Sequence, residues 1–107
     1  MKRGTLCWVN LGSVSPPEFG KTRPGLIISN SVQNLALDTV VVIPLSSQPP
    51  DIWPLRLKIS LPGGKASFVV LPGIRQVSKL RIADVISFAA PEEVERITQA
   101  VEAYLSD

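Results

Sequence analysis

The chain has 107 residues, the length of one small domain, and we interpret residues 1–107 as a single domain. Hydrophobic residues make up 45% of it, enough to fill one core without a disulfide or a metal ion. The single cysteine, Cys7, excludes an internal disulfide and a cysteine-based zinc site, and its apolar surroundings predict a buried core thiol. The absence of histidine excludes histidine triads, Cys–His pairs and histidine metal sites. No apolar run is long enough for a signal peptide or a membrane span, which predicts a cytoplasmic protein with no membrane partner.

Charge is divided unevenly along the chain. Residues 1–81 hold ten Lys and Arg against three Asp and Glu, a net of +7. Residues 82–107 hold one Arg against six acids, a net of −5, so the whole chain carries +2. A basic body of this kind attracts phosphates, and we expect the acidic segment to lie apart from that surface. Charge alone leaves open the alternative of a surface that is merely solvated.

Short β-rich runs, separated by prolines and glycines, occupy most of the chain. The run at 54–60 alternates apolar and polar residues, and the turn at 61–64 connects it to the next run as a hairpin. The run at 39–45 is apolar throughout, as in a strand that is covered on both faces. In chain order the predicted strands are 5–9, 25–29, 39–45, 54–60, 66–71 and 85–88.

The last segment is helical in pattern. Pro91 suits the first position of a helix, and Glu92 and Glu93 favour the positive end of its dipole. Apolar residues then recur at helical spacing and predict a face that docks on the sheet: Val94, Ile97, Val101, Tyr104 and Leu105. A shorter helical turn is predicted over 79–82, with Ser78 as its N-cap. Many short strands with one terminal helix predict a mainly β fold, a curled sheet or small barrel.

The segment 18–24 is the first candidate site. Gly20 permits a tight turn, and Pro24 pushes Arg23 into an extended conformation at the mouth of the next strand. The guanidinium would then be fixed at its base and free at its tip, and its planar fork suits a phosphate. From this segment alone, a surface arginine in a loop is an equal alternative.

Two further polar groups follow in the chain. Ser46 and Ser47 come directly after the run at 39–45, where side chains would lie at a rim, although they are also ordinary turn residues. The segment 74–81 is basic and could contact phosphates or pair with carboxylates of the C-terminal helix. No phosphate-binding glycine loop and no carboxylate cluster with metal-ligand spacing is present, so we expect no cofactor and no metal.

These three groups, in this order, resemble the MazF/PemK family of toxin endoribonucleases. The similarity covers nearly the whole chain: 2–11 is similar to the family's opening strand, 16–30 to its most recognisable motif and 39–47 to the strand that carries its hydroxyl. The resemblance implies a small SH3-like antiparallel β-barrel with a C-terminal helix, of the MazF/CcdB kind, and a homodimer. It also implies a cognate antitoxin whose acidic tail covers the basic groove, in a type II toxin–antitoxin system.

The resemblance further implies metal-independent, sequence-specific cleavage of single-stranded RNA. The ribose 2′-hydroxyl attacks the adjacent phosphate and leaves a 2′,3′-cyclic phosphate. Arg23 matches the family's catalytic arginine, which would stabilise the phosphorane, and Ser46 matches its catalytic hydroxyl. The substrate-binding residues implied with them are Glu18, Lys21, Thr22, Ser47, Arg75 and Gln76. Without histidine, the sequence leaves open whether Arg23 or water carries the protons.

The chain departs from the family at Pro72 and Gly73, where an acid or Gln often contacts bases, and at Gln76, where Thr is usual. These changes concern the RNA sequence that is recognised. Two other classes of function stay open. One is a catalytically silent RNA-binding or regulatory barrel. The other is a gyrase-directed poison like the CcdB toxins, which the ending 103–107 argues against because it lacks their Trp-Gly-Ile type of ending.

Overall fold

The computed structural model describes residues 1–13, 15 and 17–106. Within these residues the chain forms seven strands, two α-helices and three short 3-10 turns. The strands are β1 (Thr5–Asn10), β2 (Thr22–Ile27), β3 (Thr39–Ser46), β4 (Arg56–Ser60), β5 (Ala66–Val70), β6 (Arg75–Ser78) and β7 (Ile82–Phe88). The helices are α1 (Ser31–Ala36) and α2 (Pro91–Tyr104), and the turns are η1 (Pro62–Gly64), η2 (Leu71–Gly73) and η3 (Lys79–Arg81).

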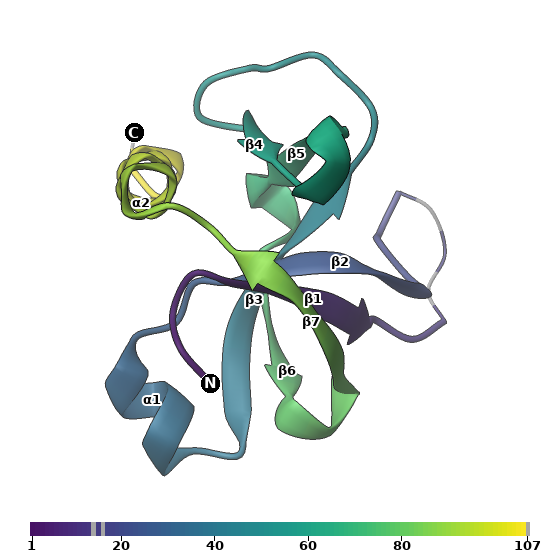
Figure 1. Ribbon diagram of the computed structural model, residues 1–107, viewed down its shortest axis with the longest axis vertical. Helices are drawn as coiled ribbons and strands as arrows, with labels where there is room; N and C mark the ends of the chain where they lie inside the picture. The colour runs from purple at the N-terminus through teal and green to yellow at the C-terminus, as the bar shows by residue number, and fades with distance from the viewer. Residues whose placement is uncertain (14, 16, 107) are drawn as a thin grey trace.

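The strands make one curled antiparallel sheet in the order β4-β5-β3-β2-β1-β7, and β6 pairs with β3 outside this path. The sheet bends at β3, because its first half pairs with β6 and its last two residues pair with β5. Figure 1 shows the result, with β4 and β5 at one end of the molecule and β6 and α1 at the other. The predicted mainly β fold with a C-terminal helix is confirmed. The described pairings give a barrel-like sheet that is not closed, with β4 and β7 at its two ends.

Each predicted strand is present, with changes at the ends. The hairpin expected from 54–60 and 66–71 is confirmed as β4 and β5, which pair from Arg56 with Val70 to Ser60 with Ala66. The strand expected at 25–29 begins earlier, at Thr22. β3 pairs with β2 only from Gly25 onward, so Pro24 lies beside one neighbouring strand, an edge-like position where its missing N–H is tolerated.

The sequence pattern does not predict α1 or β6. Helix α1 has only six residues, too few for apolar periodicity, and begins where the Oδ1 of Asn30 accepts a hydrogen bond from the backbone N–H of Gln33 at 2.9 Å. Strand β6 has four residues, of which only Val77 is buried. Its basic and polar residues therefore indicate a surface segment, and pairing with β3 is what makes it a strand.

The interior consists of two apolar clusters. The first packs the sheet against α2 and is built around residues such as Leu6, Leu26, Ile43 and Ile97. The second contains Cys7, together with apolar residues of β1, β2, β3 and β6. Burial raises the pKa of the Cys7 thiol to about 11. The prediction of a buried core thiol is confirmed.

Helix α2 begins as the sequence predicts, with Pro91 at its first position. The carboxylate of Glu93 accepts hydrogen bonds from the backbone N–H groups of Ala90 and Ser60, both at 3.1 Å, and so joins the helix start to β4. Of the predicted face, Ile97, Val101 and Tyr104 pack in the first cluster, whereas Val94 is not part of it and Leu105 follows the last helical turn and is exposed. No helix within the described residues is long and apolar enough to cross a membrane. The predicted N-cap at Ser78 is also confirmed, because its Oγ accepts from the N–H of Leu80 in η3.

A buried polar link holds α1 on the sheet. The hydroxyl of Ser29 donates to Oδ1 of Asn34 at 2.6 Å, and Nδ2 of Asn34 donates to the carbonyl of Ser29 at 3.0 Å. The same hydroxyl accepts from the N–H of Val41 in β3 at 3.0 Å. Asn34 thus connects the helix, through Ser29, to the central strand of the sheet.

We expect Asn34→Ala to lower the free energy of unfolding by about 2–3 kcal/mol, because it leaves buried groups of Ser29 without partners. Urea denaturation followed by circular dichroism measures this. Val32→Ala is the matched control, since Val32 lies on the same helix and is 76% exposed, and it should change stability by less than about 0.5 kcal/mol. Equal stability of the two variants would contradict the proposed role of the link.

Candidate active site

A cavity of about 520 Å³ opens between β1 and β2 on one side and the β4–β5 hairpin on the other. We call it the Arg23 cavity. The charged side chains among its described lining residues are Arg23 and Lys65, and no carboxylate is among them. Hydroxyls of Ser46, Ser47 and Ser67 also line it. Two cations and several hydroxyls without an acid make this cavity suited to an anion.

Arg23 is the second residue of β2, and its guanidinium is held more firmly than the sequence indicates. The guanidinium carbon lies 4.4 Å from the centroid of the Phe19 ring, a cation–π contact. Nη1 donates to the carbonyl of Leu45 at 3.5 Å and Nε donates to the carbonyl of Gly20 at 3.4 Å. The expectation of a free tip is therefore only partly met. The two hydrogen bonds are long, and the other N–H groups of the fork are left for a ligand.

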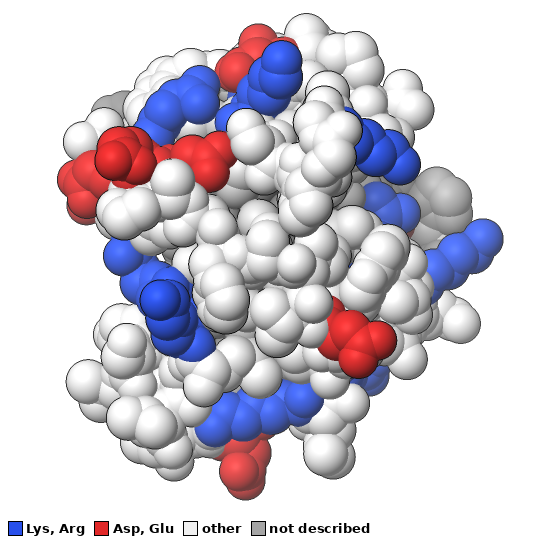
Figure 2. Space-filling model, viewed as in Figure 1, with Lys and Arg blue, Asp and Glu red and all other residues white. Residues whose placement is uncertain are grey.

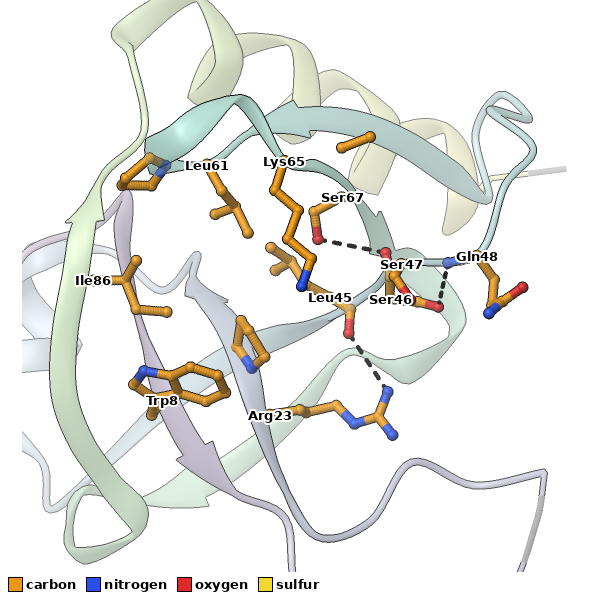
Figure 3. A pocket seen from close by; sticks show the side chains of 13 residues that line it. Trp8, Arg23, Leu45, Ser46, Ser47, Gln48, Leu61, Lys65, Ser67 and Ile86 are labelled. Carbon is orange, nitrogen blue, oxygen red and sulfur yellow. Dashed lines mark hydrogen bonds between the residues drawn. The ribbon is translucent and has the colours of Figure 1, made fainter.

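Ser46 is the last residue of β3 and follows Leu45, whose carbonyl accepts from Arg23. The Oγ of Ser46 accepts from the backbone N–H of Gln48 at 3.1 Å. That bond occupies an acceptor site of the hydroxyl, so its proton is available to a ligand in the cavity. Figure 3 shows Arg23 and Ser46 approaching the same end of the cavity from β2 and β3. The structure thus brings the two predicted catalytic residues together.

The other predicted site residues are divided between this cavity and a second one. Ser47 lies beside Ser46 in the Arg23 cavity. Glu18 and Arg75 line a separate cavity of about 730 Å³, where Nη1 of Arg75 donates to the carbonyl of Leu11 at 3.4 Å. Phe19 lines this second cavity and also contacts Arg23, so its ring connects the two cavities.

Lys21, Thr22 and Gln76 line neither cavity. The backbone of Lys21 holds the turn, because its N–H donates to Gly12 at 2.6 Å and its carbonyl accepts from Leu11 at 2.8 Å. The side chains of Lys21 and Thr22 are exposed. Gln76 lies on β6, near the opposite end of β3 from Ser46, and its Nε2 donates to Oγ1 of Thr39 at 2.8 Å. Their contacts with a substrate stay predictions.

Sequence reasoning missed three side chains of this region. Phe19 follows Glu18 in the predicted turn, but nothing in the sequence places its ring against Arg23. Trp8 lines the Arg23 cavity with 41% of its surface exposed, between the buried Cys7 and Val9. A large exposed aromatic ring in a strand is a signal that could have identified it. Lys65 directly follows a Pro-Gly-Gly turn, a place where a side chain projects from a hairpin.

Acidic side chains lie apart from the Arg23 cavity. In Figure 2 a group of them lies over α2 and others are scattered over the same face, and no described residue of α2 lines either cavity. This agrees with the expectation that the acidic segment is separate from the basic site. Within the described part of the chain, one ion pair is present, between Arg96 and Asp51 at 3.5 Å. No cluster of three or more Cys, Asp or Glu side chains that could hold a metal ion occurs in that part of the chain.

Comparison with known proteins gives relatives of the whole chain and of its fold. The chain is 26% identical over 110 residues to the endoribonuclease EndoA of Bacillus subtilis strain 168, covering 99% of this chain and 95% of that protein. Its fold is similar to that of MazF from Deinococcus radiodurans, with a TM-score of 0.83, 20% identity and coverage of 98% and 96%.

The fold is also similar to an endoribonuclease solved in complex with its cognate antitoxin from a mycobacterial species, with a TM-score of 0.81, 22% identity and coverage of 98% and 94%. A family model described as PemK-like, MazF-like toxin of type II toxin-antitoxin system matches residues 2–105. That match spans nearly the whole chain, including Arg23, Ser46 and every strand of the sheet. The chain therefore belongs to the PemK-like, MazF-like toxins of type II toxin–antitoxin systems.

Proposed function

We propose that this chain is a toxin endoribonuclease that cleaves single-stranded RNA. The observation that carries the proposal is the placement of Arg23 and Ser46 at one end of a cavity whose described lining contains no carboxylate. A phosphodiester is an anion that gains charge density on its oxygens during cleavage, so it requires a cation and hydrogen-bond donors. Relatives that are named endoribonucleases support the same assignment.

The proposed reaction is an internal transfer of the phosphoryl group. The ribose 2′-oxygen loses its proton and forms a bond to the adjacent phosphorus, while the bond from phosphorus to the 5′-oxygen breaks and that oxygen gains a proton. The products are a 2′,3′-cyclic phosphate and a 5′-hydroxyl. The guanidinium of Arg23 stabilises the charge on the phosphorane oxygens, and the hydroxyl of Ser46 donates to the same group.

Proton transfer is the step for which the described lining of the cavity offers the fewest suitable side chains. The chain has no histidine, and the described lining of the cavity offers no carboxylate. We therefore assign both proton transfers to water, because Arg23 is needed as a cation throughout the reaction. An enzyme without a positioned general base is expected to be slow, with rates about 10²–10⁴-fold below those of an enzyme that has one.

Two partners belong to this proposal. The first is an antitoxin, since a similar endoribonuclease was solved in complex with its cognate antitoxin. We expect the acidic tail of such an antitoxin to bind the basic body of this chain. Such binding should weaken with added salt, because salt screens the attraction between opposite charges. The second is another copy of the chain, since we expect the homodimer that the family resemblance implies. We expect the protein to encounter its RNA substrate in the cytoplasm.

Incubation of the purified protein with a long RNA in EDTA tests the function. We expect cuts at a limited set of sequences, with ends that carry a cyclic phosphate on one side and a free 5′-hydroxyl on the other. Sequencing of the ends, and labelling of the 5′-hydroxyl by a polynucleotide kinase, measures both. Binding of RNA without any cut would contradict the proposal and favour a silent RNA-binding barrel. Random cutting that is lost with further purification would also contradict it.

A further inference from the structure

The Arg23 cavity holds two side chains that the proposed chemistry does not use, Trp8 and Lys65. Trp8 stands opposite Pro24 in the pairing of β1 with β2, and Pro24 follows Arg23 directly. Lys65 comes from the turn between β4 and β5. Figure 3 shows Lys65 extending into the cavity from the hairpin, while Trp8 and Ile86 form the facing wall.

Packing and ion pairing within the chain do not account for these two residues. Trp8 keeps 41% of its surface exposed, although its neighbours Cys7 and Val9 are buried. Lys65 is exposed and has no carboxylate within salt-bridge distance among the described residues. An uncovered aromatic face and a cation without an acid therefore lie in one cavity, next to the site for the phosphodiester.

We propose that the space between Trp8 and Lys65 is a nucleotide subsite, in which Trp8 stacks on a base and Lys65 neutralises the phosphate of that nucleotide. The inference rests on the proposed function and adds a residue pair that binds the nucleotide next to the cleaved bond. Every base has a π-face, so stacking on Trp8 supplies affinity without selecting a sequence. An ammonium binds phosphate as a point charge, so Lys65 adds affinity that depends on salt.

Steady-state kinetics on a short RNA that contains a mapped cleavage sequence tests the subsite. Lys65→Ala and Trp8→Ala should each raise KM about tenfold, while kcat changes by less than about threefold. Lys65→Arg and Trp8→Phe should restore most of the affinity, because they keep the charge and the aromatic face. The matched controls are Lys58→Ala on the same hairpin and Trp53→Ala, both exposed and outside the two cavities, and they should leave KM unchanged.

Salt and fluorescence give two independent readouts. In Lys65→Ala the slope of log affinity against log salt should be smaller in magnitude by about 0.7, the value for one lost phosphate contact on a single strand. The chain has two tryptophans, so in Trp53→Phe the emission comes from Trp8. We expect quenching when an oligonucleotide of the cleaved sequence is added that carries 2′-deoxyribose at the cleaved bond and so cannot react.

The outcomes separate this inference from the proposed function. If the wild-type protein cuts no RNA, the function itself is wrong and the subsite with it. If the wild type cuts RNA but both alanine variants match their controls in KM, only the subsite is overturned. The subsite is also overturned if the emission of Trp8 does not change when the oligonucleotide is added but does change when the protein is diluted. Trp8 would then belong to a contact between subunits.

Discussion

Replacement of Arg23 by alanine should lower kcat/KM for RNA cleavage by about a thousandfold, the upper range for loss of one donor that stabilises charge in a transition state. The guanidinium donates to the carbonyl of Leu45, the residue directly before Ser46. Rates of cutting on a short RNA in EDTA measure the loss. Arg96→Ala is the matched control, because Arg96 lies on α2, pairs with Asp51 and lines neither cavity.

Arg23→Lys tests whether the charge or the shape of the side chain matters. Lysine keeps the cation but loses the planar fork and the stacking on Phe19, so we expect it to restore no more than about a tenth of the activity. Thermal unfolding must show that both variants remain folded. Cutting by Arg23→Ala at the wild-type rate and at the same sequences would show that another group stabilises the phosphorane. Full activity of Arg23→Lys would reduce the role to charge alone.

The parts of the fold that follow from local signals could be predicted from the sequence. The Pro-Gly-Gly turn and the alternation before it determine the β4–β5 hairpin, and Pro91 marks the start of α2. Helix α1 and strand β6 could not be predicted, because their stability comes from contacts with distant residues. Asn34 fixes α1 through Ser29, and β6 is held by its pairing with β3.

The residues of the candidate site could also be predicted only in part from the sequence. The order of the motifs and the resemblance single out Arg23 and Ser46, and the structure places both in one cavity. The motifs and the resemblance do not show that Glu18 and Arg75 lie in a second cavity. That separation depends on where the sheet bends at β3 and where Phe19 packs. Lys65 and Trp8 lie far apart in the chain, and only the folded sheet brings them together.

Ser46→Ala should lower kcat by about a hundredfold with little change in KM, because the hydroxyl donates most strongly to the charged phosphorane. Ser46→Thr should stay within about threefold of the wild type, since threonine keeps the hydroxyl and restricts its rotamer. Single-turnover cleavage of a short RNA measures the chemical step. Ser60→Ala is the control, because Ser60 is exposed on β4 and lines neither cavity. A Ser46→Ala enzyme with the wild-type kcat would remove Ser46 from the mechanism.

The double variant of Arg23 and Ser46 shows whether the two residues act on the same group. If both stabilise one phosphorane, removal of Arg23 already prevents most of the charge stabilisation that Ser46 supports, so the combined loss should be smaller than the product of the single losses. Two residues that act on separate steps would instead give the full product. Arg23 donates to the carbonyl of Leu45, the residue directly before Ser46, and this proximity at one end of the cavity favours the first result. A fully multiplicative loss would mean that Ser46 binds the substrate elsewhere than at the reacting phosphate.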